Sequence, residues 1–202
     1  MKFHQRKNWI LAGAVLTLVL TGCDWFSNAP DFEDDFITYV IRPGNHEAEN
    51  TTASLQLQTS YTLDFQAIFD ESARYTTSNP GNVYDINKLL GFSDCGLHHH
   101  GASARIGWNY MDGEVRIYTY VYSNGERIPE QFLGVAEIGK IHRYKIEIQG
   151  DQYKFSMDDR VEYVPRKCEA NPVVPLPSYR LFPYFGGDEL APHEIRIKVR
   201  ML

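Results

Sequence analysis

The stretch SARIGWNYMDGEVRIYTYVYSNGERIPEQFLGV, residues 103–135, carries the strongest fold signal in the chain. Two runs of alternating residues, 103–110 and 115–122, are separated by Asp112-Gly113, and Asn124-Gly125 follows the second run. Asp-Gly and Asn-Gly favour two-residue type I′ turns, because both residues of each pair tolerate the positive φ angles that such turns need. The stretch therefore predicts an antiparallel meander whose third strand runs over 127–135.

Similar short runs lie on both sides of this meander. We expect further strands over 36–41, 54–59, 61–69, 141–148, 153–157, 179–185 and 195–199. Residues 70–83 are rich in Ser, Thr, Asn, Pro and Gly and predict a long loop, and Ile86–Leu90 predicts a short helical turn. Short strands separated by turn signals, without a sustained helical period or an internal repeat, predict an all-β fold. The best match is an antiparallel two-sheet β-sandwich of the jelly-roll type.

The composition excludes several classes of protein. The chain has 202 residues, of which 43% are hydrophobic, so it can bury a sizeable core. Its formal net charge is -6, and residues 1–22 contain three basic residues and no acid. Without that segment, 17 basic and 26 acidic residues remain. A charge of -9 argues against a nucleic-acid partner, because such a protein needs a basic face. It also favours neutral over anionic glycans as ligands.

The N-terminus has the pattern of an export signal. Basic residues precede an apolar run over 9–20 that is short for a membrane span and suits a signal peptide. The ending Leu20-Thr21-Gly22-Cys23 resembles the lipobox of bacterial lipoproteins, and this resemblance implies cleavage before Cys23 and acylation of that residue. An ordinary secretory signal and a membrane anchor are the alternatives.

This interpretation divides the chain into three parts. Residues 1–22 are a lipoprotein signal peptide, 23–35 are an acidic tether, and 36–202 are the β-sandwich domain. Acyl chains on Cys23 would make the lipid bilayer a partner, with the protein in the bacterial cell envelope. The sequence leaves open whether this is the inner or the outer membrane. Cys95 and Cys168 would then either form a disulfide or stay as two separate buried thiols.

The run over 115–122 offers a candidate ligand-binding face. Its odd-numbered residues suit a core, whereas Arg116, Tyr118, Tyr120 and Tyr122 share the opposite face. Tyrosine rings stack on sugars and their hydroxyl groups hydrogen-bond at the edge, so this face suits a glycan. The alternative is a second buried layer or an aromatic ladder that stabilises the sheet. Trp108 would extend either version.

Three consecutive histidines lie in the segment SDCGLHHHG, residues 93–101. In an extended strand only His98 and His100 would point to the same side, so we expect no metal site and no cofactor here. A polar loop at the rim of a binding groove is the preferred interpretation. A histidine that acts as a general base is the alternative.

The segment YRLFPYFGGDELAPH, residues 179–193, is the third candidate. Gly186-Gly187 permits a bend after the strand, which would place Tyr184, Asp188 and His193 beside the histidine loop. The alternative is a corner with no function between the last two strands.

The segments GFSDCG…HHHGASARIGWNY, RIYTYVYSNGER and LFPYFGGDELAPHEIRI together resemble concanavalin-A-like jelly-roll domains of bacterial surface proteins. The resemblance covers residues 84–202. That group includes lectins, laminin-G-like modules, glycoside hydrolases and polysaccharide lyases, so it implies a fold without choosing a function. The E-x-D-x-x-E motif of the sandwich glucanases is absent. Of the alginate lyase motifs, Tyr184-Phe185-Gly186-Gly187 faintly resembles one and Arg105 or Arg116 fits a second, but the Gln-x-His element is missing.

We therefore favour a lipid-anchored envelope protein that binds poly- or oligosaccharides. A polysaccharide lyase or glycoside hydrolase of the same fold is one alternative, and a structural lipoprotein with a protein partner is another. We assign no catalytic residue, and binding is favoured over catalysis. The candidate ligand-binding residues are His98, His100, Arg105, Trp108, Arg116, Tyr118, Tyr120, Tyr122, Tyr184, Asp188 and His193.

Overall fold

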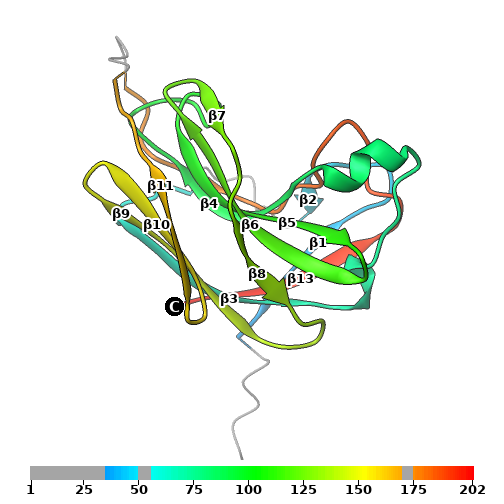
Figure 1. The fold of residues 1–202 in the computed structure, drawn as a ribbon. Helices are drawn as coiled ribbons and strands as arrows, with labels where there is room; N and C mark the ends of the chain where they lie inside the picture. The colour runs from blue at the N-terminus through cyan, green and yellow to red at the C-terminus, as the bar shows by residue number, and fades with distance from the viewer. Residues whose placement is uncertain (1–34, 50–55, 170–174) are drawn as a thin grey trace, which may run out of the picture. The chain divides into compact units, whose positions relative to one another are not determined.

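A computed structural model of the chain describes residues 35–49, 56–169 and 175–202 (Figure 1). The predicted signal peptide, the predicted acylation site Cys23 and nearly all of the acidic tether lie outside these residues, as do residues 54 and 55 of the predicted strand 54–59. The described part of that prediction, 56–59, is wrong, because Leu57 forms only an isolated bridge with Tyr179 there. Within the described residues, no helix is long and apolar enough to cross a membrane.

The described chain forms two antiparallel sheets, which confirms the predicted two-sheet sandwich. The seven-stranded sheet has the order β11 (Arg160–Pro165), β10 (Gln152–Met157), β9 (His142–Gln149), β3 (Thr62–Phe69), β13 (Ile195–Met201), β1 (Ile37–Ile41) and β2 (Ala48–Glu49). The six-stranded sheet has the order β12 (Arg180–Leu181), β4 (Asn87–Ser93), β5 (Ser103–Met111), β6 (Glu114–Ser123) and β7 (Glu126–Ile128). Its remaining strand, β8 (Phe132–Ala136), also pairs with β6.

The hydrophobic core lies between the two sheets, and alternate residues of each strand supply it. On β5 these residues are Ala104, Ile106 and Trp108, and on β6 they are Val115, Ile117 and Val121. The other sheet contributes Phe65, Tyr144 and Phe155, among others, all without exposed surface. Side chains at the positions between these point to the outer face of the six-stranded sheet.

Both predicted hairpin turns of the meander are confirmed. The φ angles are 56° and 82° at Asp112-Gly113 and 53° and 83° at Asn124-Gly125, as a type I′ turn requires. These turns fix the β5–β6 register, in which Arg105 lies opposite Tyr120 and Ser103 opposite Tyr122. The third predicted strand, 127–135, is divided between β7 and β8, with Pro129 in the gap.

The predicted helical turn over Ile86–Leu90 is wrong, because β4 begins at Asn87. The apolar residues Ile86, Leu89 and Leu90 have the i, i+3, i+4 spacing of a helix. In the structure, the β4–β5 register shifts between Lys88 and Gly91, and both leucines are buried in the core. A β-bulge therefore produces the spacing that resembles a helical face.

Two other predictions need correction, and one strand was not predicted at all. Of the expected strand 179–185, only Arg180–Leu181 is a strand, because Pro183 cannot donate a ladder hydrogen bond. The predicted loop 70–83 contains two short 3-10 helices, η1 (Glu71–Ala73) and most of η2 (Pro80–Tyr84). Strand β11 was not predicted, because its hairpin turns on Asp158-Asp159 rather than on a pair with glycine.

Candidate functional site

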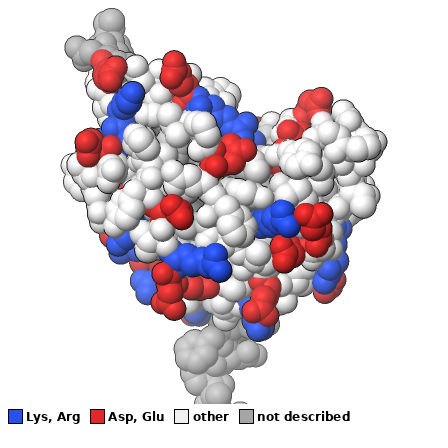
Figure 2. Space-filling view, viewed as in Figure 1, with Lys and Arg blue, Asp and Glu red and all other residues white. Residues whose placement is uncertain are grey.

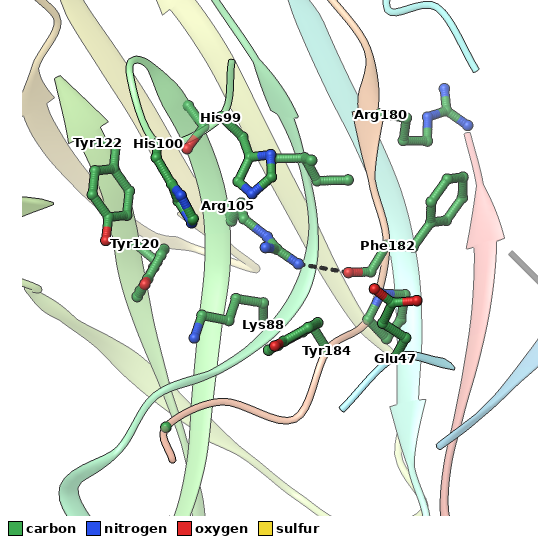
Figure 3. A pocket seen from close by; sticks show the side chains of 14 residues that line it. Glu47, Lys88, His99, His100, Arg105, Tyr120, Tyr122, Arg180, Phe182 and Tyr184 are labelled. Atoms are coloured by element: carbon green, nitrogen blue, oxygen red, sulfur yellow. Dashed lines mark hydrogen bonds between the residues drawn. The ribbon is translucent and has the colours of Figure 1, made fainter. Parts of the chain in front are cut away.

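A groove of about 540 Å³ lies on the outer face of the six-stranded sheet (Figure 3). Strands β4, β5, β6 and β12 form its floor, and the chain after β12 and the histidine loop form its sides. The groove is lined by Glu47, Lys88, His99, His100, Ser103, Arg105, Tyr120, Tyr122, Arg180, Leu181, Phe182, Pro183, Tyr184 and Gly187. Its size and its mixture of aromatic and polar groups are typical of a small-molecule or oligosaccharide site.

The predicted tyrosine face of β6 forms part of this groove. Tyr120 and Tyr122 line it, and their rings lie 6.0 Å apart, centroid to centroid. Tyr118 shares the same face of β6 but packs against Phe132 of β8, outside the groove. Tyr120 is buried, whereas Tyr118 and Tyr122 are half-buried. The face is thus partly covered, and its two ends have different surroundings.

Arg105 lies in the middle of the groove, beside Tyr120 (Figure 3). Only 8% of its surface is exposed, and its guanidinium donates one hydrogen bond, from Nη2 to the carbonyl of Phe182 at 2.6 Å. Its Nε has no hydrogen-bond partner. Burial lowers the pKa of Arg105 to about 10, so the group is still charged at neutral pH.

A glycine on the neighbouring strand provides the space for Arg105. Gly91 of β4 pairs with Arg105, and a Cβ atom at Gly91 would lie 2.5 Å from the Arg105 Cγ and 2.2 Å from the Ala104 carbonyl oxygen. Both distances are too short for a real contact. Position 91 therefore accepts only glycine while Arg105 occupies the paired position on β5.

Lys88 places a second cation in the groove. Its Nζ lies 4.7 Å from the ring centroid of Tyr120 and 5.6 Å from that of Tyr184, within cation–π range. Burial, followed by repulsion from Arg105 and Arg127, lowers the pKa of Lys88 to about 8. Within the described residues, no carboxylate lies within the 4.0 Å ion-pair distance of Lys88 or Arg105.

Tyr184 is held at the groove from two sides. Its backbone exchanges two hydrogen bonds with Lys88, with N···O distances of 2.8 and 3.0 Å. Its ring stacks on His46 at 5.1 Å with an interplanar angle of 3°. The irregular segment after β12 therefore behaves locally as an added strand that presents Tyr184 to the groove.

The histidine loop is not extended, so the alternation of side chains expected for a strand does not apply to it. Residues 99–101 form a turn, in which the Gly101 amide donates to the His98 carbonyl at 2.7 Å. His99 and His100 line the groove, whereas His98 does not. Burial, followed by repulsion from His98 and His100, lowers the pKa of His99 to about 4, so this ring is neutral at pH 7.

Besides Tyr118, two more candidates from the β5–β6 meander lie outside the groove. Trp108 has no exposed surface and packs in the core against Phe69, at 5.0 Å between centroids, because it is on the inward side of β5. Arg116 is on the outward side of β6, but it forms ion pairs with Asp112 and Glu114 at the far end of the hairpin.

Two candidates from the C-terminal segment also lie elsewhere. Asp188 accepts a hydrogen bond from the side-chain amide of Asn82. The His193 Nε2 donates to the carbonyl of Ser72 at 2.8 Å, beside η1. The bend at Gly186-Gly187 therefore brings Tyr184 to the groove but carries these two residues away from it.

Several groove residues were not predicted from the sequence, including Lys88, His99, Arg180 and Glu47. Lys88 was missed because its strand was predicted as a helical turn, and His99 because strand alternation would point it away. Arg180 and Glu47 have no sequence signal, since long-range pairing alone brings them to the groove. Arg180 donates to Gln56 and points away from the centre (Figure 3).

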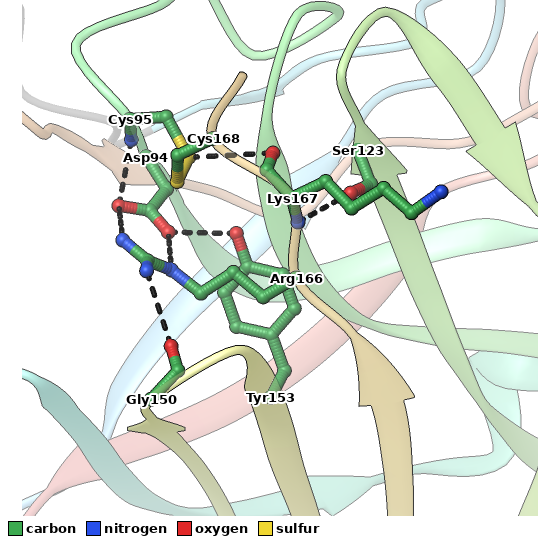
Figure 4. Close-up of polar contacts among 8 residues, drawn as sticks. All are labelled: Asp94, Cys95, Ser123, Gly150, Tyr153, Arg166, Lys167 and Cys168. Carbon is green, nitrogen blue, oxygen red and sulfur yellow. Dashed lines mark hydrogen bonds and ion pairs between the residues drawn. A yellow bond between two sulfur atoms is a disulfide. The ribbon is translucent and has the colours of Figure 1, made fainter.

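A polar network supports the base of the histidine loop (Figure 4). Asp94 accepts hydrogen bonds from Arg166 Nε at 2.6 Å, from the Tyr153 hydroxyl at 2.7 Å and from the Cys95 amide at 2.7 Å. Burial opposes ionisation of Asp94, but these three bonds outweigh it and keep its pKa below the usual value. Beside the network, Cys95 and Cys168 form a disulfide, the first of the two alternatives that the sequence offered.

The charge inside the groove is opposite to that of the whole chain. Acidic and basic side chains are interspersed over the face shown in Figure 2. Three basic residues line the groove, and Glu47 is the single acid among its described lining residues. The local environment therefore favours an anion, in contrast to the preference for neutral glycans inferred from the net charge.

No known protein family and no curated protein matches this sequence. Among solved structures, the chain is similar to alginate lyase AlyC3 in complex with dimannuronate, with 10% identity and a TM-score of 0.55 over 85% of this chain and 75% of that one. It is also similar to alginate lyase vAL-1 from Chlorella virus, with 12% identity and a TM-score of 0.50 over 82% of each chain. At such low identity the similarity shows the fold, which is a concanavalin-A-like jelly-roll β-sandwich.

Proposed function

We propose that this protein binds an acidic glycan, with uronate residues, in the groove on its six-stranded sheet. The observation that carries the proposal is the pair of cations, Lys88 and Arg105, which lie in the groove without a carboxylate partner among the described residues. Arg105 is buried and Lys88 is half-buried. Removing an unpaired charge from water costs folding free energy, so a site that holds these two cations suits a ligand that supplies the counter-charge.

The surrounding aromatic residues suit a sugar ring. Tyr120, Tyr122 and Tyr184 line the same groove as the two cations. A pyranose could stack on a tyrosine ring while its carboxylate accepts hydrogen bonds from Arg105 and Lys88. The unused Nε donor of Arg105 supports this arrangement.

A polysaccharide lyase is the second candidate. In β-elimination, a cation neutralises the uronate carboxylate and a base removes the proton at C5. The C5–H electron pair then forms the C4=C5 double bond, the C4–O bond breaks, and the leaving oxygen takes a proton from an acid or from water. Tyr184 and His100 lie in the groove with both cations and could serve as the base. A two-carboxylate hydrolase is disfavoured, because Glu47 is the one acid among the described lining residues.

Calorimetric titration of the purified chain with oligouronates and with neutral oligosaccharides of equal length tests the proposal. We expect measurable affinity for the oligouronates alone. Lys88→Met and Tyr120→Ala should each weaken it at least tenfold, which corresponds to about 1.4 kcal/mol. Assaying the same mixtures for unsaturated products separates binding from lyase activity.

Two matched controls lie on the same face of β6. Arg116→Met removes a cation and Tyr118→Ala removes a tyrosine, but neither residue lines the groove. Both variants should bind like the unmodified chain. Equal affinity for neutral and acidic sugars, or no binding of any glycan, would contradict the proposal, and the second result would favour a protein partner.

We also propose that acylated Cys23 anchors the protein to a membrane of the bacterial cell envelope. The lipobox pattern of Leu20-Thr21-Gly22-Cys23 supports this part of the proposal. Growth with a tagged fatty acid should label the wild-type chain, and Cys23→Ser should lose the label and the membrane association. Labelling that persists in Cys23→Ser would exclude this residue as the anchor.

A further inference from the structure

The three histidines of the loop converge, although strand geometry would have separated them. One ring nitrogen from each of His98, His99 and His100 can be chosen so that all three lie within 4.8 Å of one another. The ring centroids of His98 and His99 are 3.9 Å apart, and those of His99 and His100 are 4.4 Å apart. The turn causes this convergence, because it rotates successive side chains by less than a strand does.

Backbone bonds and the adjacent network hold this turn in place. The Gly101 and Ala102 amides both donate to the His98 carbonyl, at 2.7 and 3.1 Å. The Gly101 carbonyl accepts from the Gly125 amide at 2.8 Å, and the Asp94 amide donates to the Ala102 carbonyl at 2.9 Å. The three rings are therefore close together before any ligand arrives, which lowers the entropic cost of binding.

Tyr179 supplies the supporting contact that a metal-binding histidine needs. Its hydroxyl lies 3.1 Å from the His99 Nδ1 and 3.1 Å from the His99 backbone nitrogen. Histidine ligands usually donate their second ring N–H to such an oxygen, and this fixes the tautomer and the ring orientation. With Nδ1 engaged in this way, Nε2 is the ligand atom that His99 can offer.

The donor set selects the class of ion. Imidazole nitrogens suit Zn²⁺, Ni²⁺ and Cu²⁺, whereas Ca²⁺ and Mg²⁺ prefer several oxygen ligands, and this cluster of three contains no carboxylate. Ligand nitrogens around one tetrahedral Zn²⁺ lie about 3.4 Å apart, so the most distant pair of histidine nitrogens would need to approach by up to about 1.4 Å. His98 and His100 are exposed and can make this adjustment by side-chain rotation.

We propose that His98, His99 and His100 bind one divalent transition-metal ion, of the Zn²⁺ class, at the rim of the groove. Three nitrogen ligands leave a fourth position for water or for an oxygen of a bound ligand. Since His99 and His100 also line the groove, this position lies next to the glycan site. The proposal does not depend on the glycan, because the metal site is complete without it.

Titration of the untagged full chain with ZnCl₂ in a non-coordinating buffer tests the proposal. We expect one Zn²⁺ per chain with micromolar or tighter affinity, and Co²⁺ should give the visible absorption of a nitrogen-ligated ion. His98→Gln and His100→Gln should each weaken Zn²⁺ binding tenfold or more. Tyr179→Phe should weaken it about tenfold, as is typical for the loss of a supporting contact.

His142→Gln is the matched control. His142 lies on β9, outside the histidine loop, and its ring hydrogen-bonds to Asp158. It should leave the Zn²⁺ affinity unchanged. Protection from diethyl pyrocarbonate, mapped by mass spectrometry on the unmodified chain, gives a second readout that needs no variant. Zn²⁺ should protect residues 98–100 but not His142. Unaltered binding in the His98 and His100 variants, or no saturable Zn²⁺ binding, would overturn the proposal whatever the glycan titration shows.

Discussion

At the scale of single residues, Arg105 and Lys88 carry positive charges whose removal from water costs folding free energy. A bound anion can offset this cost. Arg105 is almost fully buried and gives its single hydrogen bond to a carbonyl, and Lys88 lies over two tyrosine rings. Cation–π contacts stabilise an ammonium group less than a carboxylate does, so both groups keep unused capacity for an anion. This is the physical basis of the preference for uronates.

The lowered pKa of Lys88 predicts how oligouronate binding depends on pH. Because that pKa is about 8, the ammonium group loses its proton as the pH rises from 7 to 9, and a bound anion would lose one counter-charge. We expect oligouronate affinity to fall over this interval. Lys88→Met should bind more weakly at pH 7 and should lose this pH dependence. Calorimetric titrations at pH 7, 8 and 9 on both proteins measure the effect.

The alternative explanation for such a pH profile is a tyrosine. Burial, as the largest cause, raises the pKa of Tyr120 to about 12, so this hydroxyl stays protonated over the same interval. A pH dependence that survives in Lys88→Met would therefore assign the titration to a group other than these two residues.

At the scale of elements, the two glycine turns of the meander hold the groove in register. Gly113 has a φ of +82°, and a Cβ atom there would meet no neighbour within 4 Å. A substitution at this position thus tests backbone conformation alone, without a steric clash.

We expect Gly113→Ala to lower the free energy of unfolding by about 1 kcal/mol, because alanine disfavours the left-handed conformation. Gly113→Asn should lower the free energy of unfolding by less, since asparagine tolerates the left-handed conformation better than alanine does. Gly81→Ala is the control, because Gly81 has no positive φ and a Cβ there makes an ordinary contact at 3.4 Å. Urea unfolding measures all three. An equal loss in Gly113→Asn and Gly113→Ala would show that conformation is not the cause.

The same elements explain how far the sequence predicted the fold. Strands β5 and β6 were predictable because alternation and the Asp-Gly and Asn-Gly turns indicate the same structure. Strand β4 was not, because its bulge gives the apolar residues a helical spacing. For the site, the tyrosines of β6 were predicted from alternation, whereas Lys88 and Glu47 come to the groove through pairings of segments far apart in the chain.

At the scale of the whole molecule, Asp94 connects the two sheets. It follows the end of β4 in one sheet, while Tyr153 belongs to β10 in the other and Arg166 follows β11. The disulfide joins the same two regions across 73 residues of sequence. Closing a loop of that length lowers the entropy of the unfolded chain and so raises its free energy by about 4 kcal/mol at room temperature.

We expect Asp94→Asn to lower the free energy of unfolding at pH 7 by about 3 kcal/mol, as is typical when a buried ion pair loses one partner. The folded-state pKa of Asp94 is below its ordinary value, so its contribution is complete above that ordinary value and is lost as the pH falls further. Between pH 5 and 2 the unmodified chain should therefore lose stability more steeply than Asp94→Asn.

Glu71→Gln serves as the control for this comparison. Glu71 pairs with Arg74 on the surface, where water and salt screen the ion pair and its contribution to stability is small. Between pH 5 and 2, the free energy of unfolding of Glu71→Gln should fall as steeply as that of the unmodified chain. Parallel curves for Asp94→Asn and the unmodified chain would mean that Asp94 is not ionised in the folded state.

The β5–β6 hairpin has consequences for how such a protein can evolve. Its inward residues belong to the core, and four of the residues between them, Ser103, Arg105, Tyr120 and Tyr122, line the groove. Mutations at the half-buried Tyr122 can therefore change what the groove recognises with less effect on folding than mutations at the fully buried Ile106 or Ile117. Selection can then act on the two faces of one hairpin almost independently. A lineage could exchange ligands many times on this scaffold while the sandwich persists.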